Sequence, residues 1–254
     1  MILKNSYWYF LKALTENQCN DIIQAGLNRF ELTKQIEGED SIKASTANLK
    51  HKQGHKDSNI VLGADKTVED LRKEGVKPEQ IINRDAEVSW LNDQWIYDLI
   101  LPFIYRANKN ADWNFDIDYA ESMQFTIYKP GMFYTWHAYQ GDRPWAMFNE
   151  KTMQVPNIPG VKLPPNTTLE PKMVGKIRKI SMTLNLTSPE NYDGGNLKFD
   201  YGPHTADERF HTCTEARAKG SMIVFPSFQY HQVTPVTRGT RYSLVLWCNG
   251  KPYR

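Results

Sequence analysis

The spacing of apolar residues along the chain changes near residue 121. Before that point, two stretches have the period of an amphipathic helix. The first follows Thr15, which has capping-box spacing to Gln18. Its apolar positions are Cys19, Ile22, Ile23, Leu27 and Phe30. The second follows Ser89, and Pro102 should bend or end it. Its apolar positions are Trp90, Leu91, Trp95, Ile96, Leu99, Ile100 and Phe103.

The other segments before residue 121 have weaker patterns. Residues 7–14 predict a strand, and residues 67–75 predict a short helix that ends near Gly75. Residues 34–60 are polar and aperiodic, so we expect a surface loop there. Residues 1–120 are therefore expected to form a mainly helical part.

After Glu121 the chain alternates between short apolar runs and turns rich in Gly, Pro, Asn and Asp, which is typical of β-strands. The expected strands are 122–128, 133–139, 179–186, 196–199, 221–226, 231–236 and 241–247. Helices followed by a β-barrel predict an α+β fold in which the helices pack on one sheet. With 254 residues, a single domain is expected, with its β core at 121–250.

One long connection interrupts the strands. Residues 143–178 are rich in proline and directly follow a strand that carries a histidine. Connections of this length inside a compact domain usually serve a function. We therefore expect a lid over the site.

Composition narrows the function classes. A net charge of +2 gives no overall field that would favour nucleic acid or an anionic membrane. Three widely spaced cysteines without a CxxC motif indicate reduced thiols in a cytosolic protein. We find no signal-peptide pattern and no apolar run of about 18 residues, so a cytoplasmic protein outside the membrane is expected.

Two of the six histidines, His137 and His231, lie in strand-like surroundings. Alternation places His137 and Tyr139 on one face of their strand, together with Phe133 and Thr135. In the last strand it places Arg241, Ser243, Val245 and Trp247 on one face. Two imidazoles and a guanidinium would suit a divalent metal and a dicarboxylate. From the spacing alone, a satisfied core histidine is the more common interpretation of each.

Three stretches carry a resemblance to a known family: QFTIYKPGMFYTWH, KISMTLNLTSPENYDGGNLKF and FPSFQYHQVTPVTRGTRYSLVLWCNG. Residues 121–250 resemble the 2-oxoglutarate/iron(II) dioxygenase superfamily, in its prolyl 4-hydroxylase-like (PKHD-type) branch. The third stretch is the most specific, because Arg241 follows His231 by ten residues. The resemblance implies a double-stranded β-helix, or jelly roll, with the turn at 192–197 as a hairpin between two barrel strands.

The resemblance also implies roles. His137 and His231 would bind iron(II), and Arg241 would bind the distal carboxylate of 2-oxoglutarate with the help of Tyr128 and Ser243. Ascorbate would stimulate the reaction. The substrate would be a small molecule or a peptide, for instance a prolyl group, hydroxylated at an aliphatic C–H. Nothing in the pattern names the primary substrate or the oligomeric state.

The chain departs from the family pattern at one position. The family has an aspartate two residues after the first histidine, whereas this chain has Tyr139. Three hypotheses follow: Tyr139 binds the metal as a phenolate, Asp142 replaces the missing carboxylate, or the site is impaired. The third hypothesis keeps open a second class of function, a β-helix protein that binds a metal, a dicarboxylate or a partner without turnover.

Overall fold

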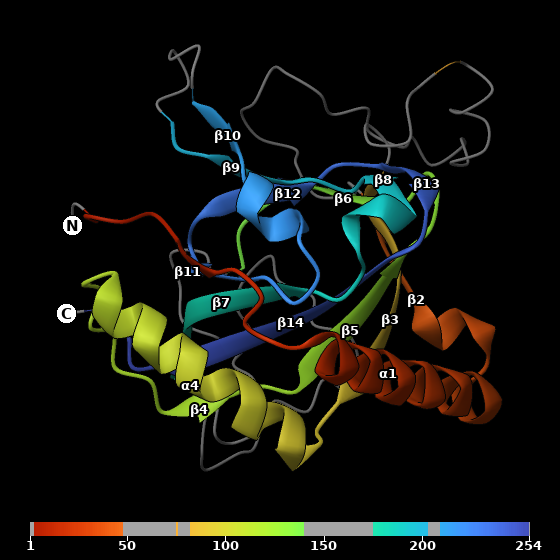
Figure 1. Ribbon diagram of the computed structural model, residues 1–254, viewed down its shortest axis with the longest axis horizontal. Coiled ribbons are helices and arrows are strands. Elements are labelled where there is room, and N and C mark those ends of the chain that lie inside the picture. The colour runs from red at the N-terminus through yellow and green to blue at the C-terminus, as the bar shows by residue number, and fades with distance from the viewer. Residues whose placement is uncertain (1–2, 48–74, 76–81, 140–174, 203–208, 254) are drawn as a thin grey trace, which may run out of the picture.

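The structure is a computed structural model that describes residues 3–47, 75, 82–139, 175–202 and 209–253. A curled antiparallel sheet dominates it, in the order β1-β11-β7-β14-β5-β3-β6-β12-β9-β10, with β2 on β3 and β4 on β14. Helices α1 and α4 lie on one side, and β6, β12, β9 and β10 lie on the other (Figure 1). Strands β13 and β8 form a separate small sheet within the described residues.

The strand bounds are β1 (Trp8–Phe10), β2 (Lys43–Ala47), β3 (Ile82–Leu91), β4 (Tyr119–Ala120), β5 (Met123–Tyr128), β6 (Phe133–His137), β7 (Ile177–Asn185), β8 (Tyr192–Gly194), β9 (Leu197–Asp200), β10 (Phe210–Thr212), β11 (Met222–Pro226), β12 (Tyr230–Val233), β13 (Val236–Gly239) and β14 (Arg241–Gly250). Short 3-10 turns lie at Glu39–Ile42, Pro189–Asn191 and Thr214–Arg217.

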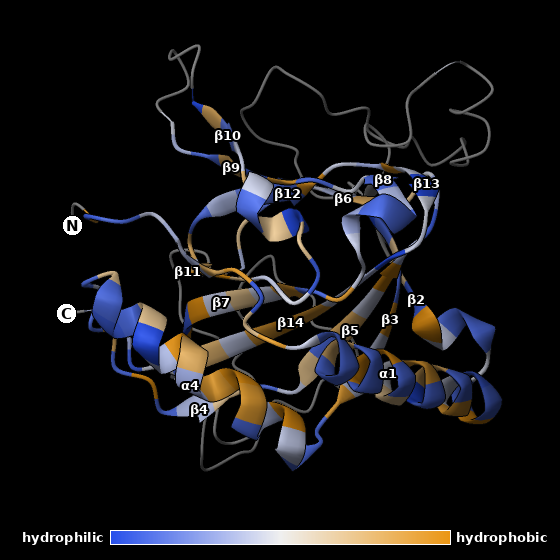
Figure 2. Ribbon diagram, viewed as in Figure 1, coloured by the Kyte–Doolittle hydropathy of each residue, from blue (hydrophilic) through white to orange (hydrophobic). Residues whose placement is uncertain are grey.

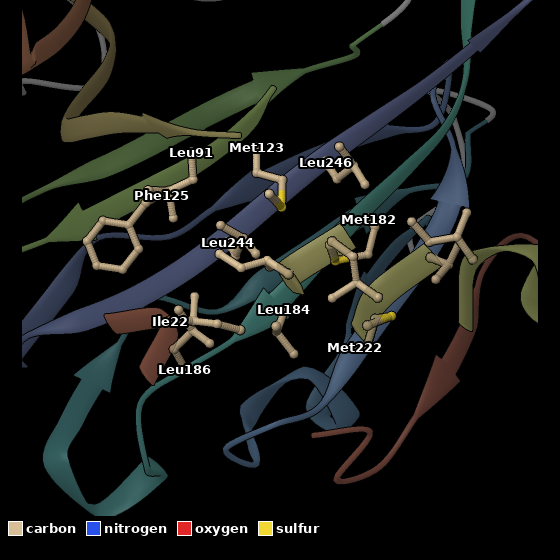
Figure 3. Close-up of a cluster of buried hydrophobic side chains, with 14 of the residues drawn as sticks. Ile22, Leu91, Met123, Phe125, Met182, Leu184, Leu186, Met222, Leu244 and Leu246 are labelled. Atoms are coloured by element: carbon tan, nitrogen blue, oxygen red, sulfur yellow. The ribbon is translucent and has the colours of Figure 1, made fainter. Parts of the chain in front are cut away.

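Helix α1 (Glu16–Glu37) begins as the sequence predicts. The Thr15 side chain accepts from the Gln18 backbone N–H, and the Gln18 side chain accepts from the Thr15 backbone N–H, so the capping box is confirmed. Its buried face contains Cys19, Ile22, Gly26 and Phe30. This face packs on the sheet, where Ile22 belongs to the same buried cluster as Phe125, Leu186 and Leu244 (Figure 3).

Helix α4 (Gln94–Asn110) covers the same side of the sheet. Its buried positions, Ile96, Ile100, Ile104 and Ala107, recur every three or four residues. Hydrophobic residues gather on this helix and along β7 and β14 beneath it (Figure 2). Pro102 lies inside the helix, which continues to Asn110, so the proline does not end it.

The prediction of a helix directly after Ser89 is wrong. Ser89, Trp90 and Leu91 belong to β3, which lies between β5 and β6 in the sheet. Trp90 and Leu91 happen to fit the helical period of the apolar residues in α4. Only two residues separate the end of β3 from the start of α4, so the sequence pattern did not show the boundary between them. The N-terminal part of the chain therefore contributes a strand to the centre of the sheet.

Most of the strands expected after residue 121 are present, with shifted ends. The expected strand 231–236 is divided between β12 and β13, and the expected strand 7–14 is reduced to the three residues of β1. The turn at 192–197 is not a hairpin, because β8 pairs with β13 while β9 pairs with β12 and β10.

Several predictions lie partly or wholly outside the described residues. The proposed loop at 34–60 contains the end of α1, a 3-10 turn and β2 up to residue 47, and the rest is not described. The expected helix at 67–75, apart from Gly75, and the lid, up to residue 174, also lie outside the described part. Neither α1 nor α4 is long and apolar enough to span a membrane. Cys19, Cys213 and Cys248 are buried free thiols.

Strand β14 shows how the sheet separates core from site. Tyr242, Leu244, Leu246 and Cys248 pack in the cluster beneath the helices, as alternation predicts. Arg241 and Ser243 lie on the opposite, concave face, paired with Tyr128 and Thr126 of β5. This end of the inner face of the curled sheet is therefore polar.

Candidate metal and dicarboxylate site

Two histidines face each other on neighbouring strands of the concave side. His137 ends β6 and is the direct antiparallel partner of His231 in β12. Their ring centroids are 4.2 Å apart, at an interplanar angle of 53°. Directly opposed residues in an antiparallel pair share a face, so both imidazoles point into the barrel. The structure thus brings together the two histidines that the sequence singled out.

Backbone carbonyls fix the protonation of both rings. Nδ1 of His137 lies 2.7 Å from the Thr135 carbonyl, and Nδ1 of His231 lies 2.9 Å from the Gln229 carbonyl. A carbonyl only accepts, so each Nδ1 carries a proton and donates it. Each Nε2 is then left with a free lone pair directed into the interior.

Both Nε2 atoms are buried, and neither has a hydrogen-bond partner among the described residues. Burial lowers the pKa of His231 to about 4, and burial together with the neighbouring His231 lowers the pKa of His137 well below its usual value. Both rings are therefore neutral at neutral pH. Two orphaned, neutral imidazole nitrogens in a buried place fit a transition-metal ion.

A β-bulge changes the inner face of β6. His231 pairs with His137, but Val233 pairs with Tyr134, so three steps along β6 match two along β12. The bulge places Tyr134, not Thr135, on the face of His137, and their rings stack with centroids 3.4 Å apart. The predicted placement of Phe133 and Thr135 on the face of His137 is therefore wrong. A bulge leaves no mark in single-sequence alternation, which explains why Tyr134 was missed.

Tyr139 lies beside both histidines, although β6 ends at His137. Its ring centroid is 4.9 Å from that of His137 and 4.6 Å from that of His231. It also packs edge-on against Trp247 at 5.0 Å, and its backbone N–H donates to the Ser227 carbonyl. Burial raises the pKa of its phenol well above the usual value, so without a bound cation the group is neutral.

The structure adds no carboxylate to the two histidines. Among the described residues, no group of three or more His, Cys, Asp or Glu side chains is arranged to hold a metal ion. Asp142 lies outside the described ranges. In the part of the chain that is described, the side chain nearest to the family's carboxylate position is therefore the ring of Tyr139.

Arg241 forms the second element of the site. It is only 3% exposed, its Nη1 donates to Ser243 Oγ at 3.3 Å, and its guanidinium lies over the Tyr128 ring at 5.6 Å. Its Nε is buried without a partner, and no carboxylate pairs with it within the described ranges. A buried guanidinium without a counter-ion is suited to bind an anion.

The turn before β9 makes room for Arg241. Gly195 has φ +58°, and a Cβ there would come within 2.9 Å of Arg241 Cδ. Gly195, the second of the paired glycines, therefore permits both the turn and the close approach of the Arg241 side chain. The sequence indicated only a turn at this position.

A charged network supports the opposite end of the inner face. Arg178 pairs with Glu121 through two contacts of 2.6 Å, and Asn249 donates to the same carboxylate at 2.8 Å. The Arg178 guanidinium lies 4.1 Å from the centre of the Trp247 ring. This network holds Trp247 against Tyr139, so the position of Tyr139 is fixed from both sides.

Comparison with known proteins agrees with this arrangement. Residues 123–249, half of the chain, match the family described as the 2OG-Fe(II) oxygenase superfamily, and the chain belongs to this family. The name of the family implies Fe(II) and 2-oxoglutarate. The expected membership is confirmed, and His137, His231 and Arg241 all lie within the matched region.

Curated relatives match over shorter segments. A PKHD-type hydroxylase of Cupriavidus metallidurans is 36% identical over 91 residues, which are 35% of this chain and 36% of that protein. A PKHD-type hydroxylase of Hyphomonas neptunium is 41% identical over 68 residues, 27% of each chain. The matched segments thus span about a third or less of these relatives.

Solved structures confirm the fold. The viral collagen prolyl hydroxylase of Paramecium Bursaria Chlorella virus-1 has a TM-score of 0.53 at 15% identity and covers 97% of both chains. A Pseudomonas putida prolyl-4-hydroxylase has a TM-score of 0.53 at 15% identity over 98% of this chain and 95% of that one. The predicted α+β double-stranded β-helix, with helices on one sheet, is therefore correct.

Proposed function

We propose that this protein is an Fe(II)- and 2-oxoglutarate-dependent oxygenase that hydroxylates an aliphatic C–H bond. One observation carries the proposal: three buried nitrogens, Nε2 of His137, Nε2 of His231 and Nε of Arg241, face the same interior, and none has a hydrogen-bond partner among the described residues. Buried polar groups normally have partners, so three such groups together indicate ligands. The family match supports the identity of those ligands.

Each residue has a role that follows from its chemistry. His137 and His231 hold the iron through Nε2, and the carbonyls of Thr135 and Gln229 keep these rings in the metal-binding tautomer. Arg241 binds the distal carboxylate of 2-oxoglutarate. Iron with this cosubstrate supplies the oxidising chemistry when bound, and the protein orients the substrate and excludes water.

Tyr128 and Ser243 assist Arg241 in this proposal. Ser243 Oγ already accepts from Arg241, and the ring of Tyr128 lies beneath the guanidinium. Both side chains are nearly fully buried and come from directly neighbouring strands. They would hold the guanidinium in one orientation and offer hydroxyl groups to the same carboxylate.

A peptidyl prolyl group is the proposed substrate. The matched relatives are PKHD-type hydroxylases, and the structural neighbours are prolyl hydroxylases, one of them solved with a peptide fragment of hypoxia inducible factor. We further propose that the protein works in the cytoplasm, which is supported by its three free, buried thiols.

Tyr139 supports a second candidate function. Its ring fills the space beside both imidazoles, and burial keeps its phenol protonated unless a cation ionises it. A neutral phenol is a weaker iron ligand than a carboxylate. The protein would then bind the metal or the dicarboxylate with little or no turnover.

Succinate formation from 2-oxoglutarate, with Fe(II), oxygen and ascorbate, tests the proposal. The protein should release succinate, and His137→Ala and His231→Ala should abolish the release. His211→Ala is a matched control, because this histidine contacts Tyr7 outside the site. Binding of Mn(II) and 2-oxoglutarate without succinate formation would favour the second candidate. Absence of binding would reject both.

A further inference from the structure

A second arginine lies on the inner face of the sheet. Arg84 in β3 is the direct partner of Tyr134 in β6, and its guanidinium lies over the Tyr134 ring at 4.8 Å. The Tyr134 ring in turn stacks on His137 with centroids 3.4 Å apart. Arg84 therefore places a positive charge one aromatic ring away from a proposed iron ligand.

The side chain extends along the interior. Arg84 Nη2 donates to Gln124 Oε1 at 2.7 Å, although the backbone partner of Gln124 is Trp90, six residues further along β3. The curl of the sheet brings these positions within reach of each other. Gln124 pairs directly with Val245, which shares a face of β14 with Arg241 and Ser243, so the guanidinium lies over the inner face of the sheet.

Arg84 has no anionic partner within the described ranges. Its Nε is buried without a hydrogen bond, and its one side-chain acceptor among the described residues is a neutral amide. Three other arginines do pair with carboxylates: Arg178 with Glu121, Arg238 with Asp193 and Arg209 with Asp200. Glu87, on the same strand, is occupied by Lys129. A guanidinium placed in this way costs free energy until an anion binds it.

We propose that Arg84 binds a carboxylate of the organic substrate. The inference rests on the proposed function and names the substrate class. In that function Arg241 holds one end of 2-oxoglutarate and the metal holds the other, so no carboxylate of the cosubstrate is left for Arg84. In the bound substrate the acid group lies beside Arg84, separated from the metal site by the ring of Tyr134. The substrate is either a small amino-acid-like molecule or a peptide with an acidic residue near the reacting group.

Binding of matched acid and amide probes tests this. Mn(II)-loaded protein saturated with 2-oxoglutarate is titrated, without oxygen, with N-acetylproline or its amide, and with blocked Ala-Pro-Glu or Ala-Pro-Gln. Relaxation of the probe protons by Mn(II) reports binding near the metal. In at least one pair the acid should bind about tenfold more tightly than the amide, as a charge-assisted hydrogen bond predicts. The pair that responds identifies the small-molecule or the peptide source.

Variants assign the effect to this residue. Arg84→Gln should remove the preference for the acid, and Arg84→Lys should retain part of it. Arg106→Gln, an exposed arginine on the outer helix α4, should keep it in full. The affinity for 2-oxoglutarate should stay within about twofold of the parent in all three, because no charge-assisted bond to it is lost.

Equal binding of acid and amide in the parent, for both pairs, would overturn the inference, while succinate formation by the same protein would uphold the proposed function. A preference that persists in Arg84→Gln would also overturn it. So would a loss of 2-oxoglutarate affinity in Arg84→Gln as large as that in Arg241→Gln, because Arg84 would then bind the cosubstrate. A parent that binds neither Mn(II) nor 2-oxoglutarate would reject the proposed function and this inference together.

Discussion

The imidazoles of the site are oriented by their own strands. Each Nδ1 donates to the carbonyl two residues earlier in the chain, so no separate side chain is required to hold the ring. Metal-bound histidines often rely on a carboxylate for this purpose, which also makes them more basic. A carbonyl fixes the tautomer without adding a negative charge to the site. Among the described residues, no acid beside the histidines therefore offsets the positive charges of Arg84 and Arg241.

Arg241→Gln should weaken 2-oxoglutarate binding by about tenfold to a hundredfold, because charge-assisted hydrogen bonds contribute roughly 1.5–3 kcal/mol each. Calorimetric titration of Mn(II)-loaded protein measures this. Arg238→Gln is the matched control, since Arg238 is exposed and pairs with Asp193 outside the barrel. If Arg241→Gln binds 2-oxoglutarate as tightly as the parent, Arg241 does not hold the cosubstrate.

Tyr139→Asp should bind Fe(II) at least about tenfold more tightly than the parent, because it restores a small anionic ligand in place of a phenol that burial keeps neutral. It should also increase succinate formation. Metal titration and the succinate assay are the two measurements. Equal turnover in parent and variant would contradict an impaired site.

Tyr139→Phe separates the remaining hypotheses for this position. If the phenol ionises and binds iron, the ferric parent should be coloured by a phenolate charge-transfer band, and Tyr139→Phe should lose both colour and affinity. A colourless ferric complex whose activity disappears in Asp142→Ala would instead make Asp142 the third ligand. Unchanged metal binding in both variants would leave the two histidines as the protein's ligands.

At the level of elements, the packing of α1 on the sheet depends on a glycine. A Cβ on Gly26 would lie 2.4 Å from the base of the Phe125 ring, which is fully buried, and the Gly26 carbonyl accepts from Ser89 at 3.0 Å. Helix and strand therefore approach more closely than any other residue would permit. Glycine lowers the intrinsic helix propensity at this position, but it allows α1 to pack closely over the core.

Gly26→Ala should destabilise the protein by about 1–3 kcal/mol, since overpacking outweighs the gain of about 1 kcal/mol in helix propensity. Denaturant unfolding measures the change. Glu31→Ala, at an exposed position of the same helix, should have little effect. Adding Phe125→Leu to Gly26→Ala should recover part of the loss, which a double-mutant cycle would show. A stabilising Gly26→Ala would contradict the described contact.

Elements that keep an uninterrupted period could be predicted from the sequence. Alternation correctly placed Arg241 and Ser243 on one face of β14 and Leu244 on the other, in the core, because β14 runs regularly through these positions. Alternation failed in β6, where the bulge places Tyr134 on the face of His137. It also failed at the end of β3, because Trp90 and Leu91 continue the helical period of the apolar residues in α4, which begins soon after. Arg84 was missed for the second reason, since its strand was not recognised.

The short strands could not be predicted from the sequence, for a different reason. Strands β4, β8 and β10 have two or three residues each, which is too few to show a period. Their pairing is decided by contacts distant in sequence, such as that of Tyr192 with Gly239. The site was largely predictable because its two histidines and Arg241 lie in stretches that resemble the family, whereas Tyr134 and Arg84 depend on tertiary pairing.

For the whole molecule, burial predicts the behaviour of the thiols. It raises the pKa of Cys19 to about 11 and the pKa values of Cys213 and Cys248 to about 12, with nearby carboxylates contributing at all three and Lys219 opposing the rise at Cys19. A raised pKa leaves little thiolate at pH 8, whereas a free cysteine, with a pKa of about 8.5, is partly ionised there.

The native protein should therefore react slowly with a chromogenic disulfide reagent at about pH 8, and all three cysteines should react within minutes once guanidinium unfolds it. The time course of colour release measures this. Gln24→Cys, at an exposed position of α1, supplies a fast-reacting internal reference. Fast release of three equivalents from the folded parent would contradict the described burial.

Strand β14 has a consequence for how the chain can change in length. From Ser243 onward both of its faces are buried, with one face in the core and the other toward the interior. Inserting or deleting one residue in a strand exchanges its two faces. A single such event beside Arg241 would direct the guanidinium into the hydrocarbon packing beneath α1 and α4 and would turn leucines toward the cosubstrate. Length variation in this chain should therefore be tolerated in the connections between strands, whereas β14 keeps its residue count.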